Sequence, residues 1–158
     1  EAAKKIFDIY PSIKFRLLGE IKENDKDYID LDYIKFWTNK ISLEFLGNND
    51  DVRKYYKSSH CIILPSYREG LSKSLIEAGS IGRPSLASNV PGCNHIIEDN
   101  KNGLLFKAKD SDSLFQTIVK FVEMPKKLKV NMSINARKKV VENFNEKDVI
   151  NRYLEVIN

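Results

Sequence analysis

Short apolar runs alternate with longer amphipathic stretches along most of this chain. Each apolar run has the length of a strand and is bounded by turn-forming residues. We predict strands at Ile13–Leu18, Ile41–Leu46, Cys61–Leu64, Pro84–Ser88 and Gly103–Phe106. Helical spacing between them predicts helices at Asp27–Asn39, Asp50 or Asp51 to Ser58, Ser72–Ile81, Asp110 or Ser111 to Glu123, Pro125–Val141 and Glu146–Ile157. Strands separated by helices indicate a doubly wound parallel sheet of the α/β class.

Polar and glycine residues follow several of the predicted strands. These positions are Glu20, Gly47, the loop Ser66–Glu69 and the segment Ser88–Gly92. A turn is predicted at Val90–Cys93. Ligands bind at the carboxyl ends of the strands in such sheets. We therefore expect these residues to converge on one edge.

The first ten residues, Glu1–Tyr10, have the pattern of the end of an amphipathic helix, without a start signal or an initiating Met. We expect that the chain is a fragment and that at least one strand and part of this helix lie upstream. The 158 residues themselves, 42% of them hydrophobic, are enough for one core and one domain.

Composition narrows the class of partner. The net charge of +4 is spread along the chain, which argues against nucleic-acid binding. No apolar run is long enough to cross a bilayer, and the two cysteines form no disulfide framework, so we expect a cytoplasmic protein. Six basic residues of the predicted 125–141 helix could face anionic lipid at the inner face of a membrane, although a solvated helix face is the safer interpretation: Lys126, Lys127, Lys129, Arg137, Lys138 and Lys139.

The stretch between the third strand and the next helix carries the most informative residues. Glu69 lies in a glycine-bearing loop, and Glu77 lies eight residues later inside the predicted helix. A helix start offers free backbone N–H groups to a phosphate. A carboxylate on each side of such an anion site suits a ligand with a phosphate centre and hydroxyls at both ends, as in a nucleotide sugar. The plainer interpretation is that Glu77 only pairs with Lys73 at i,i+4.

These residues carry a family resemblance. The segment Glu69–Ala78, Glu-Gly-Leu-Ser-Lys-Ser-Leu-Ile-Glu-Ala, resembles the Glu-x7-Glu motif of glycosyltransferase family 4. Further segments match the family in order and spacing: Phe15–Glu20, Phe45–Gly47, Gly82–Pro84, Val90–Gly92 and Asn102–Phe106. The resemblance covers nearly the whole chain. It implies that residues 1–158 are the C-terminal, Rossmann-like, nucleotide-sugar-binding domain of a GT-B enzyme, truncated at its N-terminus and lacking the acceptor domain.

The resemblance also implies a role for each matching residue. Glu69 would be the catalytic residue, bound to the donor sugar near the reacting carbon, and Glu77 would accept from the ribose hydroxyls. Gly19 and Gly47 would line the same cleft, near the base in the case of Gly47. Backbone contacts to the sugar and diphosphate would come from Gly70, Leu71, Ser72, Ser74 and Leu75.

Two departures from the family pattern stand out. The Arg and Lys that usually neutralise the leaving diphosphate should lie before Glu1, outside this chain. After Pro91-Gly92 the family often has a Glu where this chain has Asn94-His95, so the roles of His95 and Glu98 stay open. Arg68 could reach a phosphate or could be a solvated residue at a loop tip.

The function implied is retaining, metal-independent transfer of a hexose or N-acetylhexosamine from a nucleotide diphosphate sugar to a glycan or lipid-linked acceptor. No further cofactor is expected, and no Asp-x-Asp pair is present to hold a metal. The N-terminal domain of the same protein is the implied partner, and the isolated chain is expected to be inactive. A sugar-nucleotide epimerase and a non-catalytic nucleotide-binding module are the alternatives. Plain dinucleotide binding is disfavoured because no Gly-x-Gly-x-x-Gly follows a strand.

Overall fold

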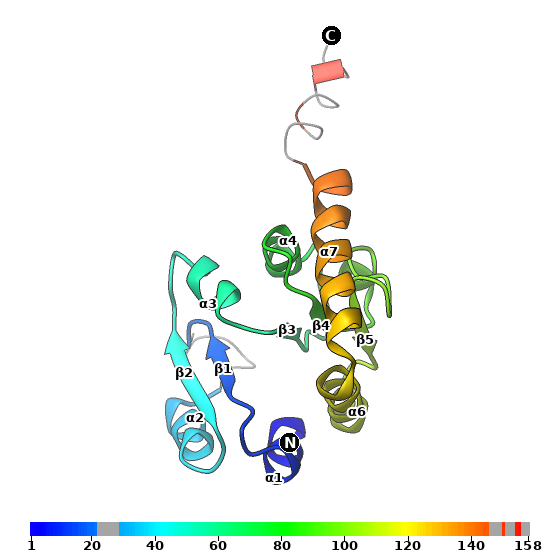
Figure 1. Ribbon diagram of the computed structural model, residues 1–158. Coiled ribbons are helices and arrows are strands. Elements are labelled where there is room, and N and C mark those ends of the chain that lie inside the picture. The colour runs from blue at the N-terminus through cyan, green and yellow to red at the C-terminus, as the bar shows by residue number, and fades with distance from the viewer. Residues whose placement is uncertain (22–28, 146–149, 151–153, 156–158) are drawn as a thin grey trace. The chain divides into compact units, whose positions relative to one another are not determined.

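A computed structural model describes residues 1–21, 29–145, 150 and 154–155 of the chain. The chain forms two compact units, Glu1–Val52 and Arg53–Asn158, which we call the first and the second unit. Figure 1 shows the helices and strands of both. Each unit is an α/β structure with its own parallel sheet.

The first unit contains two helices and two strands in alternation: α1 (Ala2–Ile9), β1 (Phe15–Leu18), α2 (Leu31–Thr38) and β2 (Leu43–Gly47). The strands pair in parallel, from Phe15 opposite Leu43 to Leu18 opposite Gly47. The Asp30 carboxylate caps α2 by accepting from the Asp32 N–H at 3.0 Å. The predicted helix Asp27–Asn39 is therefore confirmed in its later part, and its first two residues lie outside the described ones.

The second unit contains the remaining elements: α3 (Arg53–Lys57), β3 (Ile62–Leu64), α4 (Lys73–Ser80), β4 (Ser85–Ser88), α5 (Pro91–Asn94), β5 (Gly103–Phe106), α6 (Ser111–Glu123) and α7 (Lys126–Asn143). Its sheet is parallel in the order β3-β4-β5. All four residues of β4 are buried, as expected for the central strand of a parallel sheet covered on both faces.

One cluster of the hydrophobic core of the second unit lies under α4 and α5. Its buried members are Leu75, Ala87, Cys93, Ile96 and Ile97. Helix α4 also packs against α7, and the two helices lie side by side in Figure 1. At this contact a Cβ on Gly79 would lie 2.6 Å from Cγ2 of Val140, so only glycine lets the helices approach this closely.

The predicted parallel α/β class and all five strands are confirmed. The strands form two parallel sheets, β1-β2 and β3-β4-β5, where the sequence predicted one. The other differences are local. The turn predicted at residues 90–93 is the short helix α5, which begins at Pro91 because proline suits the first helical position. The Asp110 carboxylate caps α6 by accepting from the Asp112 and Ser113 N–H groups. Most of the predicted final helix Glu146–Ile157 lies outside the described residues.

Candidate functional site

Glu69 lies where the chain leaves the sheet, in the loop that joins β3 to α4. Its carboxylate is half-buried and accepts a hydrogen bond from the Ser66 hydroxyl at 2.7 Å. This bond fixes one carboxylate oxygen, Oε1, from within the loop itself. The other oxygen is left to accept from a ligand hydroxyl.

The start of α4 follows this loop directly. Ser72 occupies the N-cap position, as predicted, but its buried side chain makes no capping hydrogen bond. The first backbone bond of the helix runs from the Ile76 N–H to the Ser72 carbonyl at 3.2 Å. The N–H groups of the preceding turn therefore point beyond the helix end, where a helix attracts negative charge.

Two predicted contact residues at this helix start differ in what they can offer. Leu75 is 1% exposed, with its side chain in the core, so only its backbone can contact a ligand. Leu71 is 60% exposed, so its apolar side chain is open to solvent beside the helix start. Exposed leucine at such a position can cover the apolar face of a bound sugar or base.

Glu77 lies one turn deeper in α4 and is half-buried. Its Oε1 is 3.7 Å from Lys73 Nζ, so the plain i,i+4 ion pair is present, but Lys73 is almost fully exposed. The Tyr56 hydroxyl on α3 also interacts with Glu77 and with Ser74. Burial is the main cause that raises the pKa of Tyr56, and the neighbouring Glu77 carboxylate raises it further, while the Ser74 hydrogen bond acts in the opposite direction.

A third segment, α5, packs against the Glu69 loop. A Cβ on Gly92 would lie 1.7 Å from the Gly70 carbonyl oxygen and 2.4 Å from that of Glu69, so no other residue fits there without movement. The next residue, Cys93, interacts electrostatically with the Glu69 carboxylate. Burial is the first cause that raises the pKa of its thiol, and the Glu69 charge is the second.

In the first unit the structure brings Gly19 and Gly47 together. The Gly19 N–H donates to the Gly47 carbonyl at 3.0 Å, just past the paired ends of β1 and β2. Gly47 has a φ of 65°, which favours glycine, and a Cβ on either residue would meet nothing within 4 Å. Both backbones thus border open space at the carboxyl edge of their sheet. That this edge and the Glu69 loop form one site stays a prediction.

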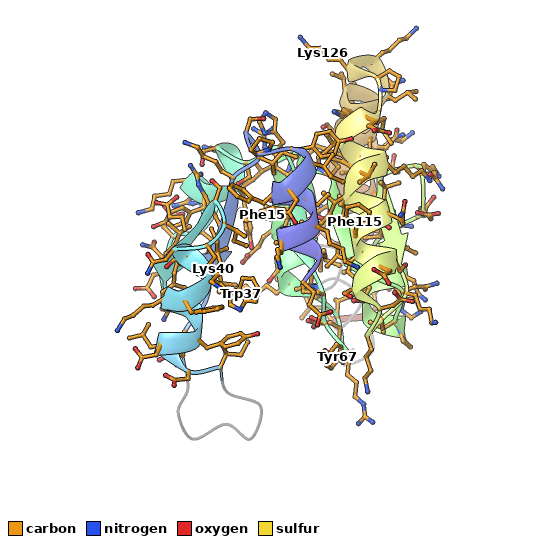
Figure 2. All side chains as sticks on the ribbon, turned by 90° about the horizontal axis from the view of Figure 1, so that it is seen from below. Phe15, Trp37, Lys40, Tyr67, Phe115 and Lys126 are labelled. Atoms are coloured by element: carbon orange, nitrogen blue, oxygen red, sulfur yellow. The ribbon has the colours of Figure 1, made fainter. Side chains whose placement is uncertain are left out.

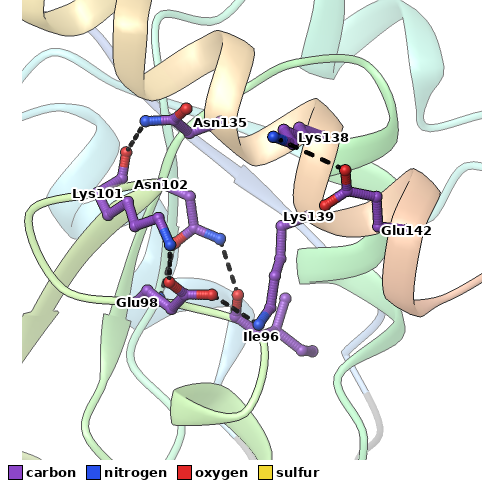
Figure 3. A network of polar contacts seen from close by, with 8 residues as sticks. All are labelled: Ile96, Glu98, Lys101, Asn102, Asn135, Lys138, Lys139 and Glu142. Atoms are coloured by element: carbon purple, nitrogen blue, oxygen red, sulfur yellow. Dashed lines mark hydrogen bonds and ion pairs between the residues drawn. The ribbon is translucent and has the colours of Figure 1, made fainter.

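Glu98, whose role the sequence left open, is engaged in an ion-pair network shown in Figure 3. Its carboxylate contacts Lys101 Nζ at 2.5 Å and Lys139 Nζ at 2.6 Å. The hydrogen bonds from these two lysines lower its pKa to about 2. Glu98 therefore joins the α5–β5 loop to α7.

His95 is exposed at the end of α5, and Arg68 is exposed in the Glu69 loop.

Sequence reasoning missed two neighbours of these residues. Tyr56 is one, and its position depends on Arg83, which donates from Nε to the Tyr56 carbonyl at 3.0 Å and from Nη2 to the Lys57 carbonyl at 2.6 Å. Lys109 is another, since its Nζ lies 5.2 Å from the centre of the Tyr67 ring and places a cation beside the Glu69 loop. Their partners are distant in sequence, so no local pattern could reveal them.

A groove of about 370 Å³ in the first unit lies apart from these glycines. Its lining residues come from α1 and from the end of α2 and the turn into β2: Lys4, Phe7, Asp8, Phe36, Trp37, Lys40 and Ile41. Trp37 and Lys40 lie near one another in Figure 2. The turn into β2 is the amino end of that strand, whereas Gly47 is at its carboxyl end. The groove is therefore not the predicted donor site.

In the part of the chain that the structure describes, no helix is both long enough and apolar enough to span a membrane. Within the same residues, no group of three or more His, Cys, Asp or Glu side chains is arranged to hold a metal ion.

Residues 1–139 match the sequence profile of the family described as Glycosyl transferases group 1. The chain belongs to this family. It is 33% identical over 148 residues to the Escherichia coli UDP-Gal:alpha-D-GlcNAc-diphosphoundecaprenol alpha-1,3-galactosyltransferase, a match that covers 92% of this chain and 37% of that protein. It is 29% identical over 118 residues to the Campylobacter jejuni N,N'-diacetylbacillosaminyl-diphospho-undecaprenol alpha-1,3-N-acetylgalactosaminyltransferase. This match covers 75% of this chain and 31% of that protein.

Solved structures match the fold over almost the whole chain. Anabaena HepE in complex with UDP matches with a TM-score of 0.84 at 19% identity, over 99% of this chain and 44% of that one. The C-terminal domain of a group 1 glycosyl transferase from Francisella tularensis matches with a TM-score of 0.77 at 21% identity, over 92% of this chain and 76% of that one. The fold is that of GT-B glycosyltransferases. The chain spans about a third of the length of the curated relatives it matches.

Proposed function

We propose that the chain is the donor-binding domain of a retaining, metal-independent glycosyltransferase that uses a uridine diphosphate sugar. The observation that carries this proposal is the arrangement around α4. The helix start has N–H groups that its N-cap side chain does not satisfy, Glu69 lies before it, and Glu77 lies within it. Uridine diphosphate is the donor nucleotide named for the Escherichia coli relative and the ligand named for the Anabaena structure.

In this proposal the diphosphate binds at the start of α4. As the bond between the anomeric carbon and the diphosphate oxygen breaks, negative charge grows on the leaving group and the N–H groups of Lys73 and Ser74 stabilise it. Glu69 accepts from the sugar hydroxyls beside the developing positive centre, and Glu77 accepts from the ribose hydroxyls. The acceptor oxygen then bonds to the anomeric carbon on the face that the diphosphate leaves, and the proton of the acceptor hydroxyl passes to the departing diphosphate oxygen.

The acceptor is proposed to be a glycan or a lipid-linked sugar, because both relatives described above are named for diphosphoundecaprenol acceptors. The sugar transferred is proposed to be a hexose or an N-acetylhexosamine on the same grounds. Residues that contact the acceptor would belong to a further domain of a longer protein, in the cytoplasm. No described feature favours the epimerase or the non-catalytic module.

Calorimetry on the 158-residue chain tests the donor site directly. UDP should bind, and uridine should bind much more weakly because it lacks the diphosphate that contacts the helix start. Inorganic phosphate should compete with UDP only weakly. Equal affinities for UDP and uridine would remove the helix start from the site, and a chain that binds no nucleotide would contradict the proposal altogether.

A further inference from the structure

Helix α7 has apolar side chains on two opposite faces. The inner face packs toward α4 and comprises the buried residues Met132, Ala136 and Val140. The outer face carries three aliphatic residues with about half of their surface or more exposed. They are Val130, Ile134 and Val141, with exposed fractions of 47%, 60% and 49%.

The outer face has an ordered arrangement of apolar and basic residues around the helix axis. At about 100° per residue, its three aliphatic residues fall within about 40° of one another. Lys126 and Arg137 flank this stripe on one side, and Lys127 and Lys138 flank it on the other. The complete band covers about 120° of the helix and is about 23 Å long. We call these seven residues the outer band of α7.

Two further lysines of the same helix do not belong to the outer band. Lys139 turns inward to Glu98 at 2.6 Å, and Lys129 donates to the Val122 carbonyl at 2.8 Å. The six basic residues noted in the sequence therefore separate into two that hold the unit together and four that are exposed. The exposed four are the ones that border the aliphatic stripe, and Lys126 projects from the first turn of α7 in Figure 2.

The contacts that Arg137 and Lys138 make within the second unit leave the positive charge of the outer band available to an anionic ligand. The Arg137 guanidinium donates to the Ser80 carbonyl, which is neutral, so this contact positions the cation without cancelling it. Lys138 is paired with Glu142 at 3.8 Å, and both side chains are more than half exposed. Such an exposed pair is weak, and anionic groups can compete for the lysine.

We propose that the outer band of α7 docks on the surface of an anionic lipid bilayer, with the helix lying in the plane of the membrane. The aliphatic stripe would enter the boundary between headgroups and acyl chains, and the cations on both sides would contact headgroup phosphates. A protein partner would be expected to use aromatic anchors, which the band lacks. A nucleic acid would leave the stripe without an apolar partner. The proposal does not depend on the nucleotide site.

Vesicle flotation with the 158-residue chain tests this proposal. The chain should bind vesicles made of phosphatidylglycerol and phosphatidylcholine in equal parts, bind pure phosphatidylcholine at least roughly tenfold more weakly, and be released by salt. Ile134→Asp should lose most of the binding, because it places a charge within the stripe. Lys126→Glu combined with Lys127→Glu should weaken binding at least roughly tenfold by charge reversal on two positions.

Matched controls come from the same unit. Leu128 is 51% exposed on α7 but lies more than about 100° from the stripe, so Leu128→Asp should bind vesicles like the unaltered chain. Lys54→Glu combined with Lys57→Glu on α3 makes the same change in net charge and should reduce binding much less than the α7 pair. Circular dichroism of each variant should show an unchanged fold.

Three results would overturn the proposal. They are equal binding to anionic and neutral vesicles, equal losses in the outer-band and control variants, and self-association that Ile134→Asp abolishes, which would assign the band to a second copy of the chain. UDP affinity should be the same in every α7 variant. A chain that binds vesicles but no nucleotide would refute the proposed function alone, and the reverse result would refute the docking surface alone.

Discussion

Gly92 packs so closely on the loop that holds Glu69 that a Cβ on it would lie 1.7 Å from the carbonyl oxygen of Gly70. The backbone of α5 is thus in direct contact with the residues proposed to hold the donor sugar. A methyl group at Gly92 can be accommodated only if α5 or the loop moves. Movement of the loop would displace the Glu69 carboxylate.

Gly92→Ala should therefore destabilise the chain by about 1–3 kcal/mol, the usual cost of overpacking a buried site. It should also weaken UDP binding. Gly70→Ala is the matched control for stability, because a Cβ there would meet no atom within 4 Å, and its free energy of unfolding should stay within about 0.5 kcal/mol. Thermal unfolding of the two variants distinguishes them, and equal stability would contradict the close contact.

Glu77→Ala should weaken UDP binding by about 1.5–3 kcal/mol, the range for hydrogen bonds to a charged group. Lys73→Ala is its control, because it removes only the exposed ion-pair partner of Glu77. We expect Lys73→Ala to change affinity by no more than about 1 kcal/mol. If calorimetry gives both variants the same small loss, the ion pair is the whole role of Glu77.

Glu69→Ala in the longer enzyme should lower kcat more than it weakens donor binding, because Glu69 is proposed to act where charge develops. Glu77→Ala should instead appear mainly as weaker donor binding. The two side chains have different neighbours, Ser66 and Cys93 for Glu69 and Tyr56 and Lys73 for Glu77. Steady-state kinetics with varied donor measure the difference. Identical, purely binding defects would move Glu69 away from the reacting carbon.

Tyr56→Phe should weaken UDP binding by about 0.5–1.5 kcal/mol, since it keeps the buried ring and removes the hydroxyl that orients Glu77. The effect should depend on Glu77, so the loss should be smaller in the Glu77→Ala background. A double-mutant cycle measures this coupling. Tyr55→Phe on the same helix is the control. Additive losses would show that the Tyr56 hydroxyl does not act through Glu77.

The Glu98 network should make stability depend on pH in acid. The pKa of Glu98 falls from 4.5 in the unfolded chain to about 2 in the folded one, so the folded state binds fewer protons. Its contribution is present above pH 4.5 and is lost as the pH falls from about 4.5 toward 2. Glu98→Gln should lower Tm at pH 7 by a modest amount, because the carboxylate is partly exposed. The difference in Tm between this variant and the unaltered chain should shrink as the pH falls from about 4.5 toward 2.

Glu142→Gln is the control for this experiment, because its pair with Lys138 on the same helix is longer, 3.8 Å, and exposed. Its Tm should match that of the unaltered chain throughout. A Glu98→Gln difference that stays constant from pH 7 to pH 3 would show that the network stabilises through packing and not through charge.

Local sequence was sufficient for the elements that carry the site. The apolar runs gave all five strands because strand length and bounding turns are local properties. The start of α6, expected at Asp110 or Ser111, was placed correctly because capping acts over three residues. The Glu69 loop and the start of α4, with Ser72 at its N-cap, were also placed correctly. Whether an N-cap side chain turns toward its helix, as that of Ser72 does not, depends on the burial around it and not on a local pattern.

Contacts between distant segments were beyond the sequence. Nothing local to Tyr56 indicates that Arg83 holds its carbonyl or that Glu77 lies beside its hydroxyl. The basic residues of α7 illustrate the same limit. The sequence gives the positions of these residues around the helix axis. That Lys139 turns inward follows only from the structure, which places Glu98 beside it.

The contact between Gly79 and Val140 has a mechanical consequence. Because α4 has no side chain between its backbone and the Val140 side chain of α7, α4 can neither roll nor slide on α7 without first separating from it. Glu77 and the outer band of α7 therefore keep a fixed relation to each other. On a membrane, the tilt of α7 would set the direction from which a donor enters and the angle at which its sugar faces the lipid surface.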